Sequence, residues 1–201
     1  MSEQLILSVG REFGSGGRAI ATALAERFSL PLYDDNILRT IIESRGLSAE
    51  YTPPHDEASR NRLLYRSINS FGNSPGGNTA HMQFQYLQEQ AAAGKSFAVL
   101  GCCAEEILKD CPGLISIFVL ADPDFKLQRT MARGFISEWD ALSLMEKNDR
   151  GRKQHHNQYC KGKWGDSRNY DLCINSAKLG VQGTVDVLEQ YIRARTEEII
   201  F

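Results

Sequence analysis

Near its start the chain combines three features that together constrain the fold: an apolar run, a glycine-rich bend and a helical pattern. Residues 5–9 have the pattern of a buried strand, and residues 19–28 that of a helix with one apolar face. Gly14, Gly16 and Gly17 let backbone N–H groups turn toward an anion, and the positive end of the helix dipole points to the same place. We therefore predict a phosphate-binding loop, with a ligand-free bend as the alternative.

Farther along the chain, short apolar runs alternate with helical segments, which is typical of a parallel β-sheet covered by helices. The expected strands are residues 5–9, 30–33, 97–100, 114–120 and 172–175. The expected helices are residues 19–28, 37–44, 57–71, 81–93, 104–109, 140–159 and 184–197. The pattern predicts an α/β fold with a parallel sheet of five strands flanked by helices. A chain of 201 residues is expected to form a single domain, residues 1–201, with an exposed loop at residues 72–79.

Composition limits the partners and the location of the protein. A net charge of −2 gives no general attraction to nucleic acid or anionic membranes, so any basic site must be local. No apolar stretch approaches the roughly 20 residues of a membrane span, and the N-terminus lacks a signal-peptide pattern. Five cysteines do not suit a secreted disulfide framework in a chain of this length. We expect a cytoplasmic protein with a small-molecule ligand, binding neither nucleic acid nor membrane, and its oligomeric state is open.

The glycine loop satisfies a dinucleotide motif. Residues 14–19 fit the pattern G-x-G-x-x-G/A, and Asp34 and Asp35 lie about 20 residues farther on, where an acid that binds ribose is expected. In a dinucleotide fold, however, the strand runs almost directly into the first glycine, whereas residues 11–13 intervene here. A nicotinamide-dependent oxidoreductase therefore stays as a weaker alternative.

The longer turn favours a wrapped phosphate-binding loop of the G-x-x-x-x-G-K-[ST] kind, which begins at Gly10 and ends with a cation at Arg18. The match is imperfect because the cation is arginine instead of lysine, and Ala19 follows it where a magnesium-binding hydroxyl is expected. Ser15 is the only hydroxyl inside the loop. Arg18 can still hold phosphate through its planar guanidinium.

Five sequence blocks occur in order along the chain: SVGREFGSGGR at 8–18, YD at 33–34, RNRLLY at 60–65, WGD at 164–166 and NYDLCINS at 169–176. Together they resemble the cytidylate kinase-like family over nearly the whole chain. The resemblance implies a three-layer P-loop NTPase fold of the nucleoside monophosphate kinase type. It also implies ATP as donor, Mg²⁺ as the ion, and transfer of a phosphoryl group to a CMP-like nucleotide or a similar small acceptor.

The resemblance, together with the positions of the basic residues, suggests roles for individual side chains. The donor phosphates would be bound by the loop residues Gly10, Arg11, Gly14, Ser15, Gly16, Gly17 and Arg18, with Ser15 as the metal ligand. The acceptor would be bound by Asp34 and by three arginines of a helical region at residues 36–95, namely Arg39, Arg60 and Arg62. The catalytic residues would be Arg18, Asp34, Arg133 and Arg150. The last two would lie on a lid at residues 129–165, because phosphoryl transfer needs several cations that close over the phosphates.

Two smaller features leave alternatives open. Asp34 or Asp35 could hold magnesium-bound water or contact the acceptor, but Asp35 could equally cap the following helix. His155, His156 and Cys160 could suggest a metal site. Because adjacent histidines project in different directions from a helix, we expect them at the surface instead.

One position departs from the family pattern. The strand ending at Leu100 is usually followed in the family by Gly-Arg-Cys-Ala, whereas this chain has Cys102 in place of the arginine. If that arginine contacts the acceptor phosphate, its loss removes a charge-assisted hydrogen bond of about 1.5–3 kcal/mol. A catalytically weakened or inactive nucleotide- or phosphate-binding protein on the same fold is therefore the second hypothesis.

Overall fold

The computed structural model describes residues 4–44 and 75–197. Five strands form one sheet in which every pairing is parallel, in the order β2-β3-β1-β4-β5. The strands are β1 (Ile6–Arg11), β2 (Leu32–Tyr33), β3 (Phe97–Leu100), β4 (Leu114–Leu120) and β5 (Leu172–Asn175). The predicted α/β class and the parallel five-stranded sheet are confirmed.

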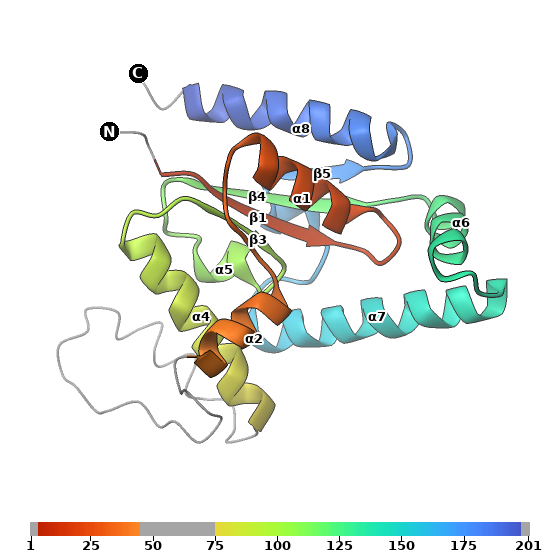
Figure 1. Ribbon diagram of the computed structural model, residues 1–201, viewed down its shortest axis with the longest axis horizontal. Coiled ribbons are helices and arrows are strands. Elements are labelled where there is room, and N and C mark those ends of the chain that lie inside the picture. Colours follow the sequence, from red (N-terminus) through yellow and green to blue (C-terminus); the bar gives the residue numbers. More distant parts are fainter. Residues whose placement is uncertain (1–3, 45–74, 198–201) are drawn as a thin grey trace.

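Helices cover both faces of the sheet and make three layers (Figure 1). On one face lie α1 (Gly17–Arg27) and α8 (Gly180–Glu197), which pack against each other. On the other face lie α2 (Asp35–Ser44), α4 (Pro75–Ala92), α5 (Ala104–Ile107) and α7 (Glu138–Tyr159). The remaining helices are α6 (Pro123–Gly134) and a 3₁₀ turn, η1 (Ser167–Asn169).

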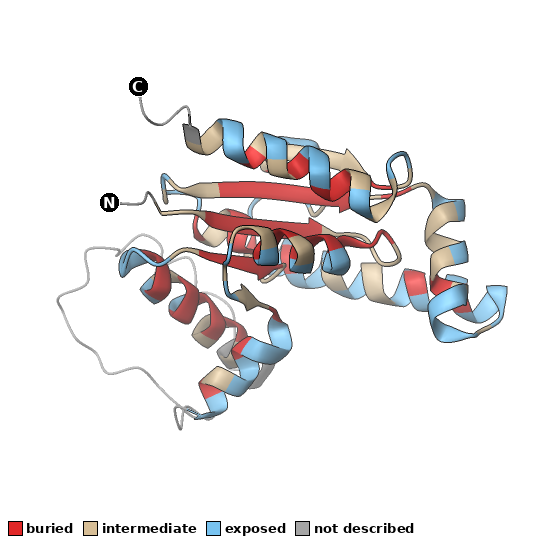
Figure 2. Cartoon of the chain, turned by 45° about the horizontal axis from the view of Figure 1, so that its top comes forward, coloured by how far each residue is buried: buried red, intermediate tan, exposed pale blue. Residues whose placement is uncertain are grey.

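The alternation of side chains along β1 divides the core between the two faces. Leu7 and Val9 are fully buried in the cluster that α1 and α8 complete. Ile6 points to the opposite face and joins the cluster formed with α2, α4 and α5. Because both faces are covered, the central strands are almost continuously apolar and buried, as Figure 2 shows.

The start of α4 differs from the prediction. Residues 75–79 were expected to belong to an exposed loop, but the helix already begins at Pro75. Proline is compatible with a first helical turn because its missing N–H would have no partner there. Buried Ala80 and Phe84 then attach this end of the helix to the body of the protein. The predicted helix at residues 57–71 lies outside the described residues.

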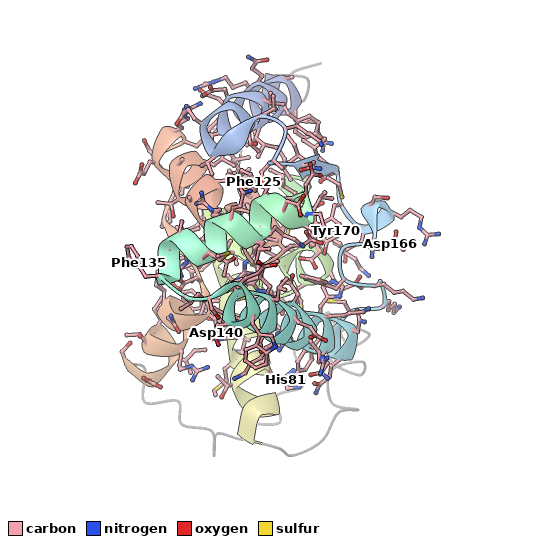
Figure 3. All side chains as sticks on the ribbon, turned by 90° about the vertical axis from the view of Figure 1, so that its right-hand side faces the viewer. His81, Phe125, Phe135, Asp140, Asp166 and Tyr170 are labelled. Carbon is pink, nitrogen blue, oxygen red and sulfur yellow. The ribbon has the colours of Figure 1, made fainter. Side chains whose placement is uncertain are left out.

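Helices α6 and α7 contact each other and project beyond the sheet (Figures 1 and 3). Phe135, at the junction between them, is 96% exposed. Pro123 occupies the first turn of α6, as predicted, with Asp122 at the N-cap. None of the helices in residues 4–44 and 75–197 is long and apolar enough to cross a membrane.

Candidate active site

The glycine loop has the wrapped shape that its sequence predicts. Gly14 and Gly16 adopt left-handed backbone conformations, with φ of 81° and 82°, and α1 begins directly afterwards at Gly17. A β-carbon at Gly14 would lie 2.9 Å from the carbonyl oxygen of Lys126, and one at Gly16 would lie 2.9 Å from Val181 Cγ2. Both the backbone angles and the close packing against α6 and α8 therefore require glycine.

Several donors around the loop have no acceptor among the described residues. The backbone N–H groups of Gly14, Ser15 and Gly16 donate to none of them. Arg129, on α6, has a buried Nε without a hydrogen-bond partner, 3.6 Å from the β-carbon position of Gly16. Unpaired donors beside a helix N-terminus are the arrangement that binds an anion. Arg129 was expected only as part of the lid region, and the structure brings it to the loop itself.

Ser15 is fully buried, and its hydroxyl is engaged within the loop. The Oγ donates to the Glu12 carbonyl oxygen at 2.8 Å and accepts from the Gly17 N–H at 3.3 Å. Ser176 Oγ donates to the Ser15 carbonyl oxygen at 2.6 Å, which ties the loop to the end of β5. These two bonds use the hydrogen and one lone pair of the hydroxyl, and the metal role of Ser15 stays a prediction.

Two helices brace the first part of the loop. Lys126 Nζ, on α6, donates to Glu12 Oε2 at 2.9 Å. Asp149 Oδ1, on α7, accepts from the Phe13 N–H at 2.7 Å, and burial raises the pKa of this carboxyl group. The region predicted as a lid is therefore in direct contact with the loop.

A cleft of about 820 Å³ opens beside the loop, at the carboxyl ends of β1 and β3 and between α2, α4 and α7. Its volume falls within the roughly 300–1,000 Å³ range of small-molecule sites. Trp164 and Tyr170 line it, and both rings pack against Phe118 of β4. The polar lining comes mainly from Arg11, Asp35, Arg39, Gln83, Arg152 and His155.

Arg11 is the most unusual cation of this cleft. It ends β1, and its guanidinium lies against Gly101 at the end of β3. Burial, together with the neighbouring cations Arg152 and Arg18, lowers the pKa of Arg11 to about 10, and nearby Asp149 offsets only a small part of this effect. No carboxylate in residues 4–44 and 75–197 forms an ion pair with it. A half-buried cation without a counter-ion is partly desolvated, so this position favours a bound anion.

Arg152, on α7, is the second cation at this place. Its Nη1 donates to the Arg11 carbonyl oxygen at 3.3 Å and lies 3.3 Å from Asp149 Oδ1. Its guanidinium also lies over the ring of Phe13, 5.5 Å from the ring centre. Burial lowers the pKa of Arg152, as it does for Arg11.

Two other arginines that were predicted to be catalytic lie away from the cleft in this structure, and their catalytic role stays a prediction. Arg150 is exposed and forms an ion pair with Glu146 on the outer face of α7. Arg133 is exposed near the end of α6. Neither lines the cleft, whereas Arg152, two residues beyond Arg150, does. Residues two apart on a helix point in different directions, which is why only one of the two lines the cleft.

Arg18 and Asp34 form an ion pair with each other. Arg18 is largely exposed at the start of α1, and Asp34 is buried at the end of β2. Asp34 Oδ1 also accepts from the Ile37 N–H at 2.9 Å, so Asp34 caps α2. The prediction that Asp35 could be this cap is wrong. Asp35 is instead the first residue of α2, where its Oδ1 accepts from Gln83 Nε2 at 2.9 Å at the cleft.

The remaining predicted acceptor residues divide into two groups. Arg39, on α2, lines the cleft, with Nη2 3.3 Å from Asp35 Oδ2. Arg60 and Arg62 lie outside the described residues. Cys102 lines the cleft beside Arg11, and burial raises its pKa to about 12. A thiol with so high a pKa is not a nucleophile at neutral pH.

The strand order argues against the dinucleotide alternative. In a dinucleotide-binding fold the second strand lies next to the first, which places its terminal acid beside the glycine loop. Here β3 separates β2 from β1. The match of residues 14–19 to the dinucleotide motif is therefore a coincidence of glycine spacing.

Three solved structures have folds similar to that of this chain. An uncharacterized protein from Eubacterium ventriosum ATCC 27560 is 37% identical, with 94% of this chain and 99% of that chain covered and a TM-score of 0.76. Shikimate kinase from Bacteroides thetaiotaomicron is 12% identical, with 94% and 98% covered and a TM-score of 0.51. TT1252 from Thermus thermophilus is 14% identical, with 96% and 97% covered and a TM-score of 0.51. At these low identities the last two show the fold alone, which is the three-layer fold of P-loop kinases.

The family assignment comes from the sequence. No curated protein shows a significant match to this chain. The model of the cytidylate kinase-like family matches residues 6–178, a range that includes the glycine loop, every described residue of the cleft and the last strand. The chain belongs to the cytidylate kinase-like family.

Proposed function

We propose that this protein is an ATP-dependent kinase that transfers a phosphoryl group to a nucleoside monophosphate, such as CMP, or to a similar small phosphate-bearing acceptor. Membership of a kinase-like family and the fold of P-loop kinases support a kinase-like function. The observation that carries the proposal is the half-buried guanidinium of Arg11, which has no ion-pair partner among the described residues and faces the cleft next to the glycine loop.

The loop residues fit the phosphates of a nucleotide donor. Unpaired N–H groups at Gly14, Ser15 and Gly16, with the buried Nε of Arg129, provide donors that a triphosphate can satisfy. These groups are held by the surrounding helices before any ligand binds, so little reorganisation is needed during the reaction. In this proposal the donor lies along the loop, and its terminal phosphate points toward Arg11.

The protein offers fewer groups for binding Mg²⁺ than for binding the phosphates. The Ser15 hydroxyl is engaged in the loop, Glu12 is paired with Lys126, and Asp34 caps α2. Asp35 and Glu43 are the exposed acids that line the cleft among the described residues. Magnesium commonly keeps several waters and uses phosphate oxygens as ligands, and when bound it neutralises charge on the transferred group. Ion binding in this proposal depends mainly on the nucleotide, with Asp35 as a protein carboxylate available at the cleft.

The acceptor occupies the cleft in this proposal. Arg11 and Arg152 bind its phosphate, and Arg39 adds a third cation from α2. Gln83 and Asp35 offer donors and acceptors from the opposite wall. Phosphoryl transfer requires the two phosphates in line and their charge neutralised. Arg11, adjacent to both the loop and the cleft, is placed to contact the group in transfer.

The experiment is a panel of nucleoside monophosphates and other small phosphorylated acceptors, incubated with ATP and Mg²⁺, with ADP release and acceptor phosphorylation as readouts. We expect phosphorylation of at least one monophosphate, and a large loss of rate in Arg11→Met. Arg150→Met is the matched control, because it removes an exposed arginine of α7 that does not line the cleft. Absence of turnover with every acceptor, in folded protein that binds ATP, would overturn the proposal.

A second candidate function is a nucleotide- or phosphate-binding protein without catalysis. Arg18 is held by Asp34, the Ser15 hydroxyl is held in the loop, and Cys102 occupies the place of the family arginine. ATP binding without turnover, unchanged in Cys102→Arg, would favour this alternative. A cytoplasmic location, suggested by the cysteine content, stays a prediction in either case.

A further inference from the structure

A second cluster of chemically reactive side chains lies at the wall of the cleft, which Glu105 and His156 help to line. It consists of Glu105 on α5, His156 near the end of α7, and Cys160 directly after α7. One potential ligand atom from each residue lies within 4.8 Å of the other two. The expectation that His156 lies at the surface is wrong: its side chain and that of Glu105 are each only 6% exposed. His155, the neighbouring residue, is the exposed one.

The Nδ1 atom of His156 has a partner that orients the imidazole ring. Nδ1 lies 3.3 Å from Asn157 Oδ1, an oxygen that also accepts from the Trp164 N–H at 3.0 Å. An amide oxygen can only accept, so Nδ1 carries a hydrogen in this contact. Metal-binding histidines typically have an acceptor of this kind on the ring nitrogen that does not bind the metal.

The other nitrogen is left without a proper hydrogen bond. His156 Nε2 is buried and lies 2.8 Å from Glu105 Oε1, but the geometry is not that of a hydrogen bond. With the hydrogen on Nδ1, a neutral ring directs the Nε2 lone pair toward a carboxylate oxygen. Two electron-rich atoms at this distance need a cation between or beside them, either a proton on the ring or a metal ion.

A thiol completes the group. Cys160 is buried, and its sulfur lies within 4.8 Å of the nearest ligand atoms of Glu105 and His156. The thiolate is the form that binds metals. Cys103, also buried, follows β3 and is the one further sulfur in contact with Cys160 within the described part of the chain.

We propose that Glu105, His156 and Cys160 bind a zinc ion. One carboxylate oxygen, one imidazole nitrogen and one thiolate sulfur form a donor set that suits Zn²⁺ better than Mg²⁺ or Ca²⁺. The carboxylate and the thiolate together carry two negative charges, which balance the charge of the ion inside a buried site. Zinc prefers four ligands, and the fourth is the sulfur of Cys103 or a water molecule.

The position of the cluster suggests what the ion does. Glu105 and Cys103 lie just after β3, whereas His156 and Cys160 belong to the end of the long helix α7. The ion therefore joins the region that braces the glycine loop to the centre of the sheet. Zinc content is measured without any phosphoryl transfer, so the two proposals can fail independently.

The test measures metal in tag-free protein purified without chelators. We expect close to one zinc per chain by elemental analysis, retained on dialysis. When zinc is replaced by cobalt, we expect the near-ultraviolet absorption of a cobalt–thiolate bond. His156→Gln is expected to weaken zinc binding by more than the roughly 10–100-fold that removal of an outer partner such as Asn157 costs. His155→Gln, the adjacent exposed histidine, is the matched control and is expected to keep the zinc.

Cys160→Ser is expected to abolish the cobalt–thiolate absorption, and Cys173→Ser is the matched cysteine control. Cys103→Ser identifies the fourth ligand. If the variant loses part of this absorption, the fourth ligand is the Cys103 sulfur. If the absorption does not change, the fourth ligand is a water molecule. The proposal is overturned if the wild-type protein neither contains nor takes up zinc, because a protonated His156 paired with Glu105 then explains the cluster. It is also overturned if zinc binding is equal in His156→Gln and His155→Gln. These measurements on wild-type protein remain decisive even where a variant does not fold.

Discussion

The guanidinium of Arg11 lies directly against Gly101, so that the ends of two neighbouring strands share one half-buried cation. Gly101 has a left-handed backbone conformation, with φ of 79°. A β-carbon there would collide with Arg11 Nη1. The glycine therefore does two things: it permits the turn after β3, and it leaves the space in which the arginine faces the cleft.

We predict that Gly101→Ala displaces Arg11 and weakens the binding of phosphate ligands. Gly94→Ala is a matched control, because Gly94 has a similar φ of 71° but nothing within 4 Å of its β-carbon position. Both variants are expected to lose roughly 1–2 kcal/mol of unfolding free energy from backbone strain. Only Gly101→Ala is expected to lose affinity for ATP or a monophosphate in titration calorimetry. Equal affinities in the two variants would show that Arg11 does not depend on this space.

Arg11→Met is predicted to weaken monophosphate binding without lowering the stability of the protein. The loss of a charge-assisted hydrogen bond of about 1.5–3 kcal/mol corresponds to an affinity for the monophosphate that is lower by roughly 10–100-fold. The free energy of unfolding, measured with urea, is expected to stay the same or to rise, because the variant removes a half-buried charge without a counter-ion. A strongly destabilised variant would contradict the view that Arg11 lacks a partner in the free protein.

Asp34 is predicted to stabilise the protein mainly as a helix cap. Asp34→Ala is expected to cost about 1 kcal/mol of unfolding free energy, because the Ile37 N–H loses its acceptor. Asp34→Asn keeps an equally good cap and removes only the charge. Since Arg18 is 58% exposed, its ion pair with Asp34 contributes little, about 0–1 kcal/mol. If Asp34→Asn proves as unstable as Asp34→Ala in urea unfolding, the ion pair is the more important contact.

Cys102 is predicted to be unreactive in the folded protein. Burial raises its pKa to about 12, so only about one molecule in ten thousand carries the thiolate at pH 8. Iodoacetamide treatment followed by peptide mass spectrometry is expected to leave Cys102 unmodified at pH 8. The same treatment in concentrated urea is expected to modify all five cysteines of the chain. Rapid labelling of Cys102 in the native protein would reopen a nucleophilic role for it.

The strands and the loop could be predicted because their signals are local. Residues 97–100, 114–120 and 172–175 are short apolar runs, and each is a strand with those bounds. Burial on both faces of a parallel sheet imposes such runs directly on the sequence. The turns at Gly14 and Gly16 follow from backbone freedom that glycine alone has at low cost. Prediction was less reliable at helix ends, as at Pro75, where tertiary contacts decide how far a helix extends.

The candidate sites depended on information that no local pattern holds. The sequence by itself determined a parallel α/β sheet, a wrapped glycine-rich loop before the first helix, and a family. Only the tertiary structure showed that Arg152 and not Arg150 reaches the cleft, that Arg11 has no counter-ion among the described residues, and that His156 is buried beside Glu105. The physical reason is that charge and hydrogen-bonding groups act through space. Their partners come from elements far apart in the chain, and the packing of α7 against the loop and the sheet decides which of them meet.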